Sequence, residues 1–182
     1  MDSNPISQRP SWDVYYLTMA FVVAQRSLDP NTKHGAIIVS KDGRVLSTGY
    51  NGPIKGSIDK EIPLTRPKKY IFFIHSEENS ILAYNGSYQD IVGSTIYVTG
   101  RPCHRCLRMI IQKGITRIIH AQTVSKVIDQ VDMDAQAIML RHHPEIKIIE
   151  TKDNVDMQML LRKTDDYIEV KKHDIKPNYE EE

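Results

Sequence analysis

Two short motifs contain residues of the types that bind and activate metal ions. His75 begins a His-Ser-Glu triplet, and Cys103 and Cys106 lie in a Pro-Cys-His-Arg-Cys run. One imidazole and two thiolates can hold zinc and leave one coordination position open, which distinguishes catalytic zinc sites from structural ones. Glu77, two residues after the histidine, is placed to move protons for a metal-activated water without binding the metal. The two motifs therefore predict a catalytic zinc centre.

Cys103 and Cys106 are the only cysteines in the chain. Two cysteines this close together exclude a disulfide framework of the kind that stabilises small secreted domains, and leave metal binding or redox chemistry. A redox pair is typical of a thioredoxin-like context, which this sequence lacks. We therefore interpret the pair as metal ligands.

Composition and charge narrow the class of protein. The chain has 182 residues, 40% of them hydrophobic and 26% charged, which suits one globular domain with a full core. A formal net charge of +1 gives no electrostatic footprint for a nucleic acid polymer or an anionic membrane. No apolar run approaches the roughly 20 residues of a membrane span, and the polar N-terminus has no signal-peptide core. We expect a cytoplasmic protein.

The elements that must position these residues begin with a helix. Ser11 is expected to cap it, and the Asp-Pro-Asn-Thr-Lys stretch at residues 29–33 ends it. The apolar residues that recur at helical spacing, and so form its predicted buried face, are Trp12, Tyr16, Met19, Ala20 and Val23.

Strands and helices alternate along the rest of the chain. Strands are expected at residues 36–40, 45–50, 94–99, 115–120 and 146–150, and helices at residues 76–84, 103–113 and 133–141. Residues 51–67 are rich in Gly and Pro and are expected to be mostly loop. This alternation predicts an α/β fold, a three-layer α/β/α sandwich with a five-stranded mixed sheet. The first two strands should form a hairpin, and the later ones, joined by helices, should run parallel.

Both halves of the metal motif fall at helix N-termini in this arrangement. The positive end of a helix dipole lowers the pKa of a thiol, so Cys103 and Cys106 can bind zinc as thiolates.

The order of the motifs identifies a resemblance. A His-x-Glu motif followed by Pro-Cys-x-x-Cys is the signature of zinc nucleobase deaminases. The chain resembles the deoxycytidylate (dCMP) deaminase family within the cytidine deaminase superfamily. The likeness covers residues 11–150, and the stretches that carry it are SWDVYY (11–16), AQRSLDP (24–30), GYNGP (49–53), HSEEN (75–79) and PCHRC (102–106).

The resemblance implies the cytidine deaminase fold and a role for each matching residue. It places zinc ligands at His75, Cys103 and Cys106 and a proton shuttle at Glu77. It places substrate contacts at Asn51, Asn31, Lys33, His34 and Ser76, and effector contacts at Arg26, Gly49, Tyr50 and Gly52. Enzymes of this family are typically hexamers that dCTP activates and dTTP inhibits, so the resemblance also implies a homo-oligomer with these effectors.

Several of these residues also have simpler interpretations. Asn51 is a sugar contact, part of the effector motif or only a turn residue before a glycine. Arg26 is a phosphate contact or an ordinary charge near a helix end. The Lys68-Lys69 pair is expected to solvate the surface.

The domain boundaries follow from the extent of the resemblance and the charge pattern. Residues 1–10 are expected to be a flexible N-terminus, and residues 11–150 a zinc-dependent deaminase domain. Residues 151–182 are expected to be an extension with a short helix at 155–161 and a charged tail at 171–182.

The chain departs from the family pattern at three places. Ser76 and Glu78 replace an alanine and an apolar residue. The tyrosine that stacks on the cytosine in similar enzymes is missing, because residues 120–125 contain no aromatic side chain except His120. There are no further cysteines for the second, structural zinc of some phage relatives. The other residues that could stack on a base are Tyr50, Tyr70 and Tyr97.

The predicted function is the hydrolytic deamination of a free nucleotide, most directly dCMP to dUMP with release of ammonia. One alternative is deamination of another free nucleotide, nucleoside or base, including a purine, which the missing tyrosine favours. The other is a nucleotide-binding regulatory protein on a deaminase fold, which the intact Glu77 disfavours because a binding module has no need of a proton shuttle. A polynucleotide substrate is disfavoured by the nearly neutral net charge.

Overall fold

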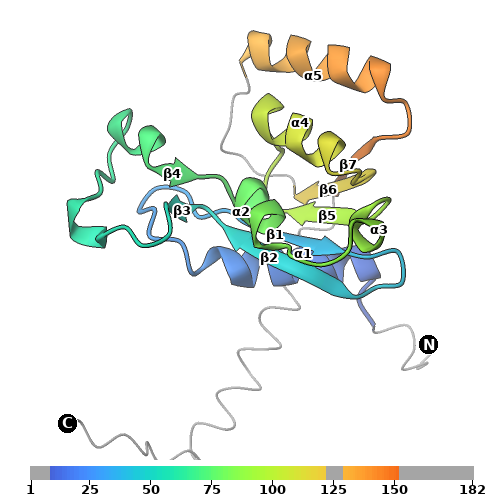
Figure 1. Cartoon of the computed structure of the whole chain (residues 1–182), viewed down its shortest axis with the longest axis horizontal. Helices are drawn as coiled ribbons and strands as arrows, with labels where there is room; N and C mark the ends of the chain where they lie inside the picture. Colours follow the sequence, from blue (N-terminus) through green and yellow to red (C-terminus); the bar gives the residue numbers. More distant parts are fainter. Residues whose placement is uncertain (1–8, 122–128, 152–182) are drawn as a thin grey trace, which may run out of the picture.

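The computed structural model describes residues 9–121 and 129–151. Its centre is a five-stranded mixed sheet in the order β2-β1-β5-β6-β7 (Figure 1). The strands are β1 (Gly35–Val39), β2 (Val45–Tyr50), β5 (Thr95–Val98), β6 (Arg117–Ala121) and β7 (Lys147–Thr151). β1 runs antiparallel to both β2 and β5, whereas β5, β6 and β7 are parallel. The predicted hairpin and the predicted parallel strands are confirmed.

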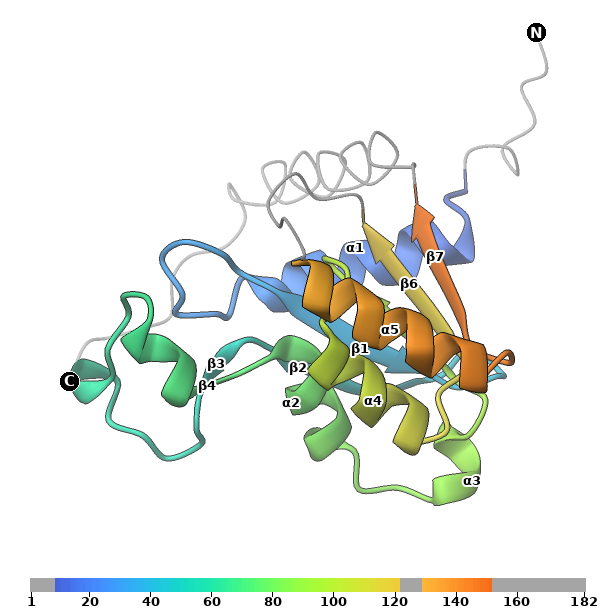
Figure 2. The same ribbon diagram turned by 90° about the horizontal axis from the view of Figure 1, so that it is seen from above.

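Helices cover both faces of this sheet and make three layers (Figures 1 and 2). Helix α1 (Trp12–Ala24) lies on one face, and α2 (Ser76–Ala83), α4 (His104–Gln112) and α5 (Gln130–His142) lie on the other. Successive strand residues point to opposite faces. In β1, Ile37 packs in the cluster beneath α1 and Ile38 packs in the cluster beneath α2 and α4. The predicted α/β/α sandwich is therefore confirmed. No helix in the two described ranges is both long and apolar enough to cross a membrane.

The buried face of α1 differs from the predicted one. Ser11 caps the helix as expected, and its hydroxyl accepts from the backbone N–H of Val14. However, Trp12 is 71% exposed, and the fully buried residues centre on Leu17 and Ala20. The prediction was wrong for Trp12, because its ring stacks on the outer side of Tyr16 with centroids 5.6 Å apart and does not face the sheet.

Residues 51–67 are mostly loop, as expected, and short regular elements lie within this segment and after it. β3 (Gly52–Pro53) pairs with β4 (Phe73–Ile74) in a separate two-stranded sheet. Between them lie two 3-10 helices, η2 (Asp59–Glu61) and η3 (Lys68–Ile71), and a short helix α3 (Tyr88–Ile91) follows α2. Periodicity could not reveal elements this short. The helix predicted at 155–161 and the charged tail lie outside the described residues.

Gly49 allows α2 to approach the sheet closely. A Cβ atom at this position of β2 would lie 2.3 Å from the backbone nitrogen of Ser80 and 2.4 Å from the backbone oxygen of Ser76, both in α2. Only a glycine fits there, because backbone atoms cannot rotate away as a side chain can. The position of α2, and of the motif at its start, therefore depends on this contact.

We predict that Gly49→Ala lowers the free energy of unfolding by about 1–3 kcal/mol, the usual cost of overpacking a tight contact. Gly52→Ala is the control, because a Cβ there would meet only the side chain of Tyr50, at 3.3 Å. Its effect should stay within about 0.5 kcal/mol. Chemical denaturation of both variants measures the difference. Equal stability of the two variants would contradict the close-packing role of Gly49.

Candidate active site

Three metal-binding side chains meet where two helices begin. His75 is the N-cap residue of α2, Cys103 is the N-cap residue of α4, and Cys106 lies in the first turn of α4. Nδ1 of His75 lies 3.6 Å from Sγ of Cys103 and 3.4 Å from Sγ of Cys106. The two sulfur atoms are 3.7 Å apart. These three residues form a candidate metal site.

The separations between the donor atoms can be compared with those around a tetrahedral ion. Zinc–sulfur bonds of about 2.3 Å and zinc–nitrogen bonds of about 2.0–2.1 Å place two sulfur ligands about 3.8 Å apart and a sulfur and a nitrogen about 3.6 Å apart. The observed separations agree with these values within about 0.2 Å, the tolerance for a credible site. The donor set therefore fits zinc in both chemistry and spacing.

The two thiols are electrostatically unequal. The hydrogen bond between the sulfur atoms, helped by the hydrogen bond to His75, lowers the pKa of Cys103 to about 3. The same bond between the sulfurs, together with burial, raises the pKa of Cys106. The two thiols thus form one coupled pair, and a bound cation favours ionisation of both.

Glu77 is buried beside these ligands. Its side chain lines the same cavity as His75 and Cys103, and the residue is only 6% exposed. The hydroxyl of Ser76 donates to Oε2 of Glu77 at 2.9 Å. Ser76, predicted as a substrate contact, thus lines the cavity and fixes one carboxylate oxygen of Glu77.

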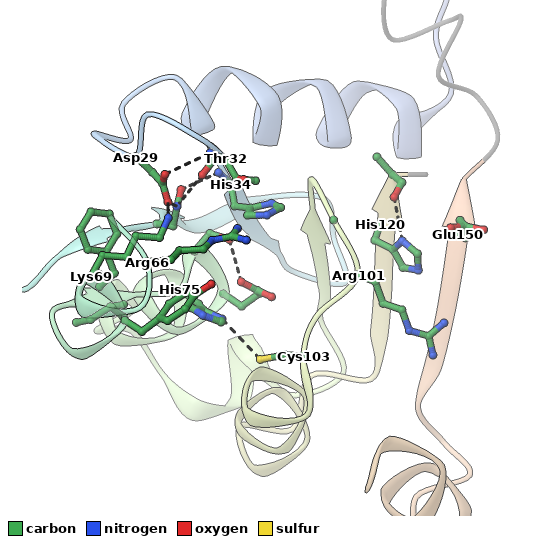
Figure 3. Close-up of a pocket in the computed structure, with 18 residues that line it drawn as sticks. Asp29, Thr32, His34, Arg66, Lys69, His75, Arg101, Cys103, His120 and Glu150 are labelled. Atoms are coloured by element: carbon green, nitrogen blue, oxygen red, sulfur yellow. Dashed lines mark hydrogen bonds and ion pairs between the residues drawn. The ribbon is translucent and has the colours of Figure 1, made fainter. Parts of the chain in front are cut away.

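The cavity is enclosed by four parts of the chain (Figure 3). The motifs at the starts of α2 and α4 form one wall. The other walls come from the loop after α1, from the segment before β4, and from the carboxyl ends of β6 and β7. The lining residues from these three regions include Asp29, Thr32, His34, Arg66, Lys69, Tyr70, His120 and Glu150. Asn51, between β2 and β3, and Phe73, in β4, also line the cavity.

Some of the predicted substrate residues line the cavity and others do not. Asn51 and His34 line the cavity, whereas Asn31 and Lys33 do not. The Asn51 side chain holds the loop after α1, because its Oδ1 accepts from the backbone N–H of His34 at 2.7 Å and its Nδ2 donates to the backbone oxygen of Thr32 at 2.9 Å. This supporting role was not foreseen from the sequence.

The four predicted effector residues lie outside the cavity lining. Arg26 is exposed just beyond the end of α1. Gly49 packs against α2, and the backbone oxygen of Tyr50 accepts from the side chain of Asn79 at 2.7 Å. Gly52 lies in β3. The structure gives Gly49 and Tyr50 clear contacts that support α2.

A buried ion pair forms part of the cavity lining. Lys69 donates to Oδ2 of Asp29, and both side chains are only 4% exposed. The expectation that Lys69 solvates the surface was wrong. The ammonium group of Lys69 lies 5.8 Å from the ring centroids of Tyr70 and of Phe73, which follow it in the sequence. An aromatic run directly after the lysine was the signal that the sequence offered.

The charge of Asp29 depends on this pair. Burial alone would raise the pKa of Asp29, but hydrogen bonds from Lys69 and from the backbone N–H groups of Asn31 and Thr32 outweigh it and hold the pKa below its usual value. The pair therefore ties the loop after α1 to the segment before β4.

Helix α5 supports the cysteine motif from behind. Oδ1 of Asp132 accepts from the backbone N–H of His104 at 2.7 Å, at the start of α4. Gln136, 2% exposed, receives a hydrogen bond from Arg101 and donates to the backbone oxygen of Pro102 at 3.2 Å. The residues on both sides of Cys103 are thus held by two side chains of α5. Sequence reasoning missed both, because neither lies in a motif.

Two of the candidate stacking residues line the cavity. These are His120 and Tyr70, whereas Tyr50 and Tyr97 do not line it. Tyr97 is buried under α1, on the opposite face of the sheet, and its hydroxyl donates to Asp13. Burial lowers the pKa of His120, so its imidazole is neutral at pH 7.

Comparison with known proteins identifies the family. The family model of the cytidine and deoxycytidylate deaminase zinc-binding region matches residues 10–122, and the chain belongs to this family. Deoxycytidylate deaminase of Homo sapiens is 38% identical over 114 residues, 59% of this chain and 63% of that protein. The chain thus spans less than two thirds of the length of this relative. The probable deoxycytidylate deaminase of Drosophila melanogaster is 32% identical over 157 residues, 76% of this chain and 75% of that protein.

A solved structure gives the same result for the fold. The dCMP deaminase of cyanophage S-TIM5, in complex with dCMP and dUMP, matches with a TM-score of 0.57 and 25% identity. The match covers 79% of this chain and 98% of that chain. The sandwich described above is therefore the fold of this deaminase class.

We predict that Lys69→Met lowers the free energy of unfolding by about 3–5 kcal/mol, because Asp29 is left as an unpaired buried charge. The pKa of Asp29 is held below its unfolded value of about 3.9, so this contribution is present above that pH and is lost as the pH falls through the lowered value. The difference between wild type and variant should therefore shrink in acid.

The control for this prediction is Lys68→Met, which changes the exposed neighbouring lysine. Denaturation curves at pH 7 and in acid measure all three proteins, and the double variant Lys69→Met/Asp29→Asn should recover part of the loss. A Lys69→Met protein as stable as the Lys68→Met protein would contradict the buried pair.

We predict that Asp132→Ala weakens metal binding by about 10- to 100-fold, the usual effect of removing a group that orients metal ligands. Asp134→Ala is the matched control, because Asp134 lies in the same helix and, within the described part of the chain, its side chain accepts only from Gln130. Competition with a chelator measures the affinity of both proteins. Equal zinc affinities would show that α5 does not orient the ligands.

Proposed function

We propose that this protein is a zinc-dependent deaminase of a free nucleotide and that it converts dCMP to dUMP and ammonia. The observation that carries the proposal is the placement of Glu77 in one cavity with His75 and Cys103, next to Cys106. Three ligands and a separate carboxylate are what hydrolysis of an aromatic amine requires, because water must be activated and protons must be moved.

The residues that would hold the zinc are His75, Cys103 and Cys106. When bound there, zinc supplies the Lewis acidity that makes water a usable nucleophile near pH 7. The spacing of the three donor atoms supports this cofactor, as does the family to which the chain belongs.

Glu77 performs the proton transfers in this proposal. Its carboxylate takes a proton from the attacking water and delivers it to the ring nitrogen next to the amine-bearing carbon. It then passes the second water proton to the departing amine, so that the products are a ring carbonyl and ammonia. The hydrogen bond from Ser76 to Oε2 orients the carboxylate.

The substrate assignment is supported by the relatives. The proteins similar to this chain include deoxycytidylate deaminases, and the S-TIM5 structure is a complex with dCMP and dUMP. His120 and Tyr70 line the cavity and offer flat faces for the base where the tyrosine of similar enzymes is missing.

Regulation and assembly rest on the resemblance alone. Activation by dCTP, inhibition by dTTP and assembly into a hexamer are expected from the family pattern. The effector contacts expected on this pattern are Arg26, Gly49, Tyr50 and Gly52. A single deaminase domain over residues 11–150 is expected on the same basis, whereas a cytoplasmic location is an expectation from the sequence pattern.

We predict that Glu77→Gln keeps the fold and about one zinc per chain but lowers kcat by about 100- to 10,000-fold, because an amide cannot shuttle protons. The comparison variant is Cys103→Ser, which should lose zinc as well as activity. Elemental analysis and ammonia release measure both quantities. Turnover by Glu77→Gln near the wild-type rate would contradict the mechanism.

We predict that dCMP gives the highest kcat/KM in an ammonia-release assay over free nucleotides, nucleosides, bases and short oligonucleotides. The panel contains dCMP, CMP, deoxycytidine and the purine monophosphates. A purine monophosphate that reacts tenfold faster than dCMP would assign the cavity to another base. No ammonia from any compound would favour the regulatory nucleotide-binding protein instead.

A further inference from the structure

Three cationic side chains line the cavity, and they differ in their partners (Figure 3). Lys69 is bound to Asp29, and Arg101 donates to the side-chain oxygen of Gln136. Arg66 makes no ion pair and no hydrogen bond with any residue in 9–121 and 129–151. Its guanidinium lies 5.9 Å from the centroid of the Tyr70 ring. Arg66 is therefore the lining cation whose hydrogen-bond donors remain available among the described residues.

The position of Arg66 connects the inner cavity to the surface. Arg66 is exposed, and Figure 3 shows its side chain extending toward His34 and His75. It also lines a shallower hollow with Thr32 and Thr65, whose hydroxyl groups can donate hydrogen bonds. Arg66 thus lies where the cavity that contains the metal ligands opens outward.

The shape of a nucleotide relates this position to the substrate. The reacting amine of a mononucleotide and its phosphate are at opposite ends of the molecule, separated by the sugar. With the amine at the candidate metal site, the phosphate must lie near the mouth of the cavity. A planar guanidinium binds phosphate oxygens through two parallel hydrogen bonds, which a hydroxyl or an ammonium group cannot do.

We propose that Arg66 binds the 5′-phosphate of the substrate and makes the enzyme prefer a nucleoside monophosphate to the nucleoside. This inference rests on the proposed function, and it assigns a role to a residue outside every motif in the sequence. The ion pair between Lys69 and Asp29 supports it, because the pair anchors the segment that carries Arg66 and keeps the neighbouring carboxylate from competing for the guanidinium.

The first test compares kcat/KM for dCMP and for deoxycytidine in the full-length zinc enzyme. Arg66→Ala should lower the value for dCMP by about 10- to 100-fold, mainly through KM, and should change the value for deoxycytidine by less than about twofold. Arg66→Lys should give an intermediate loss for dCMP, because lysine keeps the positive charge but cannot donate two parallel hydrogen bonds to a phosphate. The control is Arg108→Ala, which changes an exposed arginine of α4 outside the cavity lining and should match wild type.

The second test measures binding without turnover. Calorimetry with dUMP and with deoxyuridine should show that wild type prefers dUMP and that Arg66→Ala has lost this preference. The role of Arg66 would be overturned if Arg66→Ala lost kcat/KM equally for dCMP and deoxycytidine, or lost none for dCMP. It would also be overturned if wild type bound dUMP and deoxyuridine with equal affinity. Wild type that releases no ammonia would contradict the proposed function, and the binding data would still decide on Arg66.

Discussion

The meeting of one imidazole and two thiols within 3.7 Å is the constraint on which the rest of the structure depends. His75 comes from the start of α2, and Cys103 and Cys106 come from the start of α4. Both helices must therefore begin at the same place on one face of the sheet. A slip of either helix by one turn, about 5.4 Å, would exceed the distance over which one ion can bind all three ligands.

Each of the two helices is held in place by contacts away from the metal ligands. Gly49 lets the backbone of α2 lie directly on β2, and Ser47 adds a hydrogen bond from its hydroxyl to the backbone oxygen of Ser80. On the other side, Asp132 and Gln136 of α5 bind the backbone around Cys103. These contacts hold the ligand-bearing segments through groups other than the ligands themselves, which reduces the cost of ordering the site on metal binding.

The charges around the cavity bear on how a nearly neutral protein would bind the anionic nucleotide proposed as its substrate. The net charge of +1 gives no long-range attraction, so selectivity must arise from local groups. Asp29 neutralises Lys69 inside the wall, and Gln136 occupies Arg101. Gln136 is neutral, so Arg101 keeps its positive charge and shares only its hydrogen-bond donors. Arg66 is the lining cation that makes no hydrogen bond or ion pair among the described residues.

The sequence by itself determined the order of strands and helices along the chain and the class of fold, and it singled out the candidate metal ligands and the candidate proton shuttle. These features depend on residue type and on spacings of a few residues, which the linear pattern contains. Only the tertiary structure decided that Lys69 is buried against Asp29, that α5 supports Cys103 and that Trp12 faces away from the sheet. Asp29 and Lys69 are 40 residues apart, and Pro102 and Gln136 are 34 apart, so no local pattern relates them. Such contacts arise because folding brings separate segments to one wall, where a polar side chain must find a partner as it loses water.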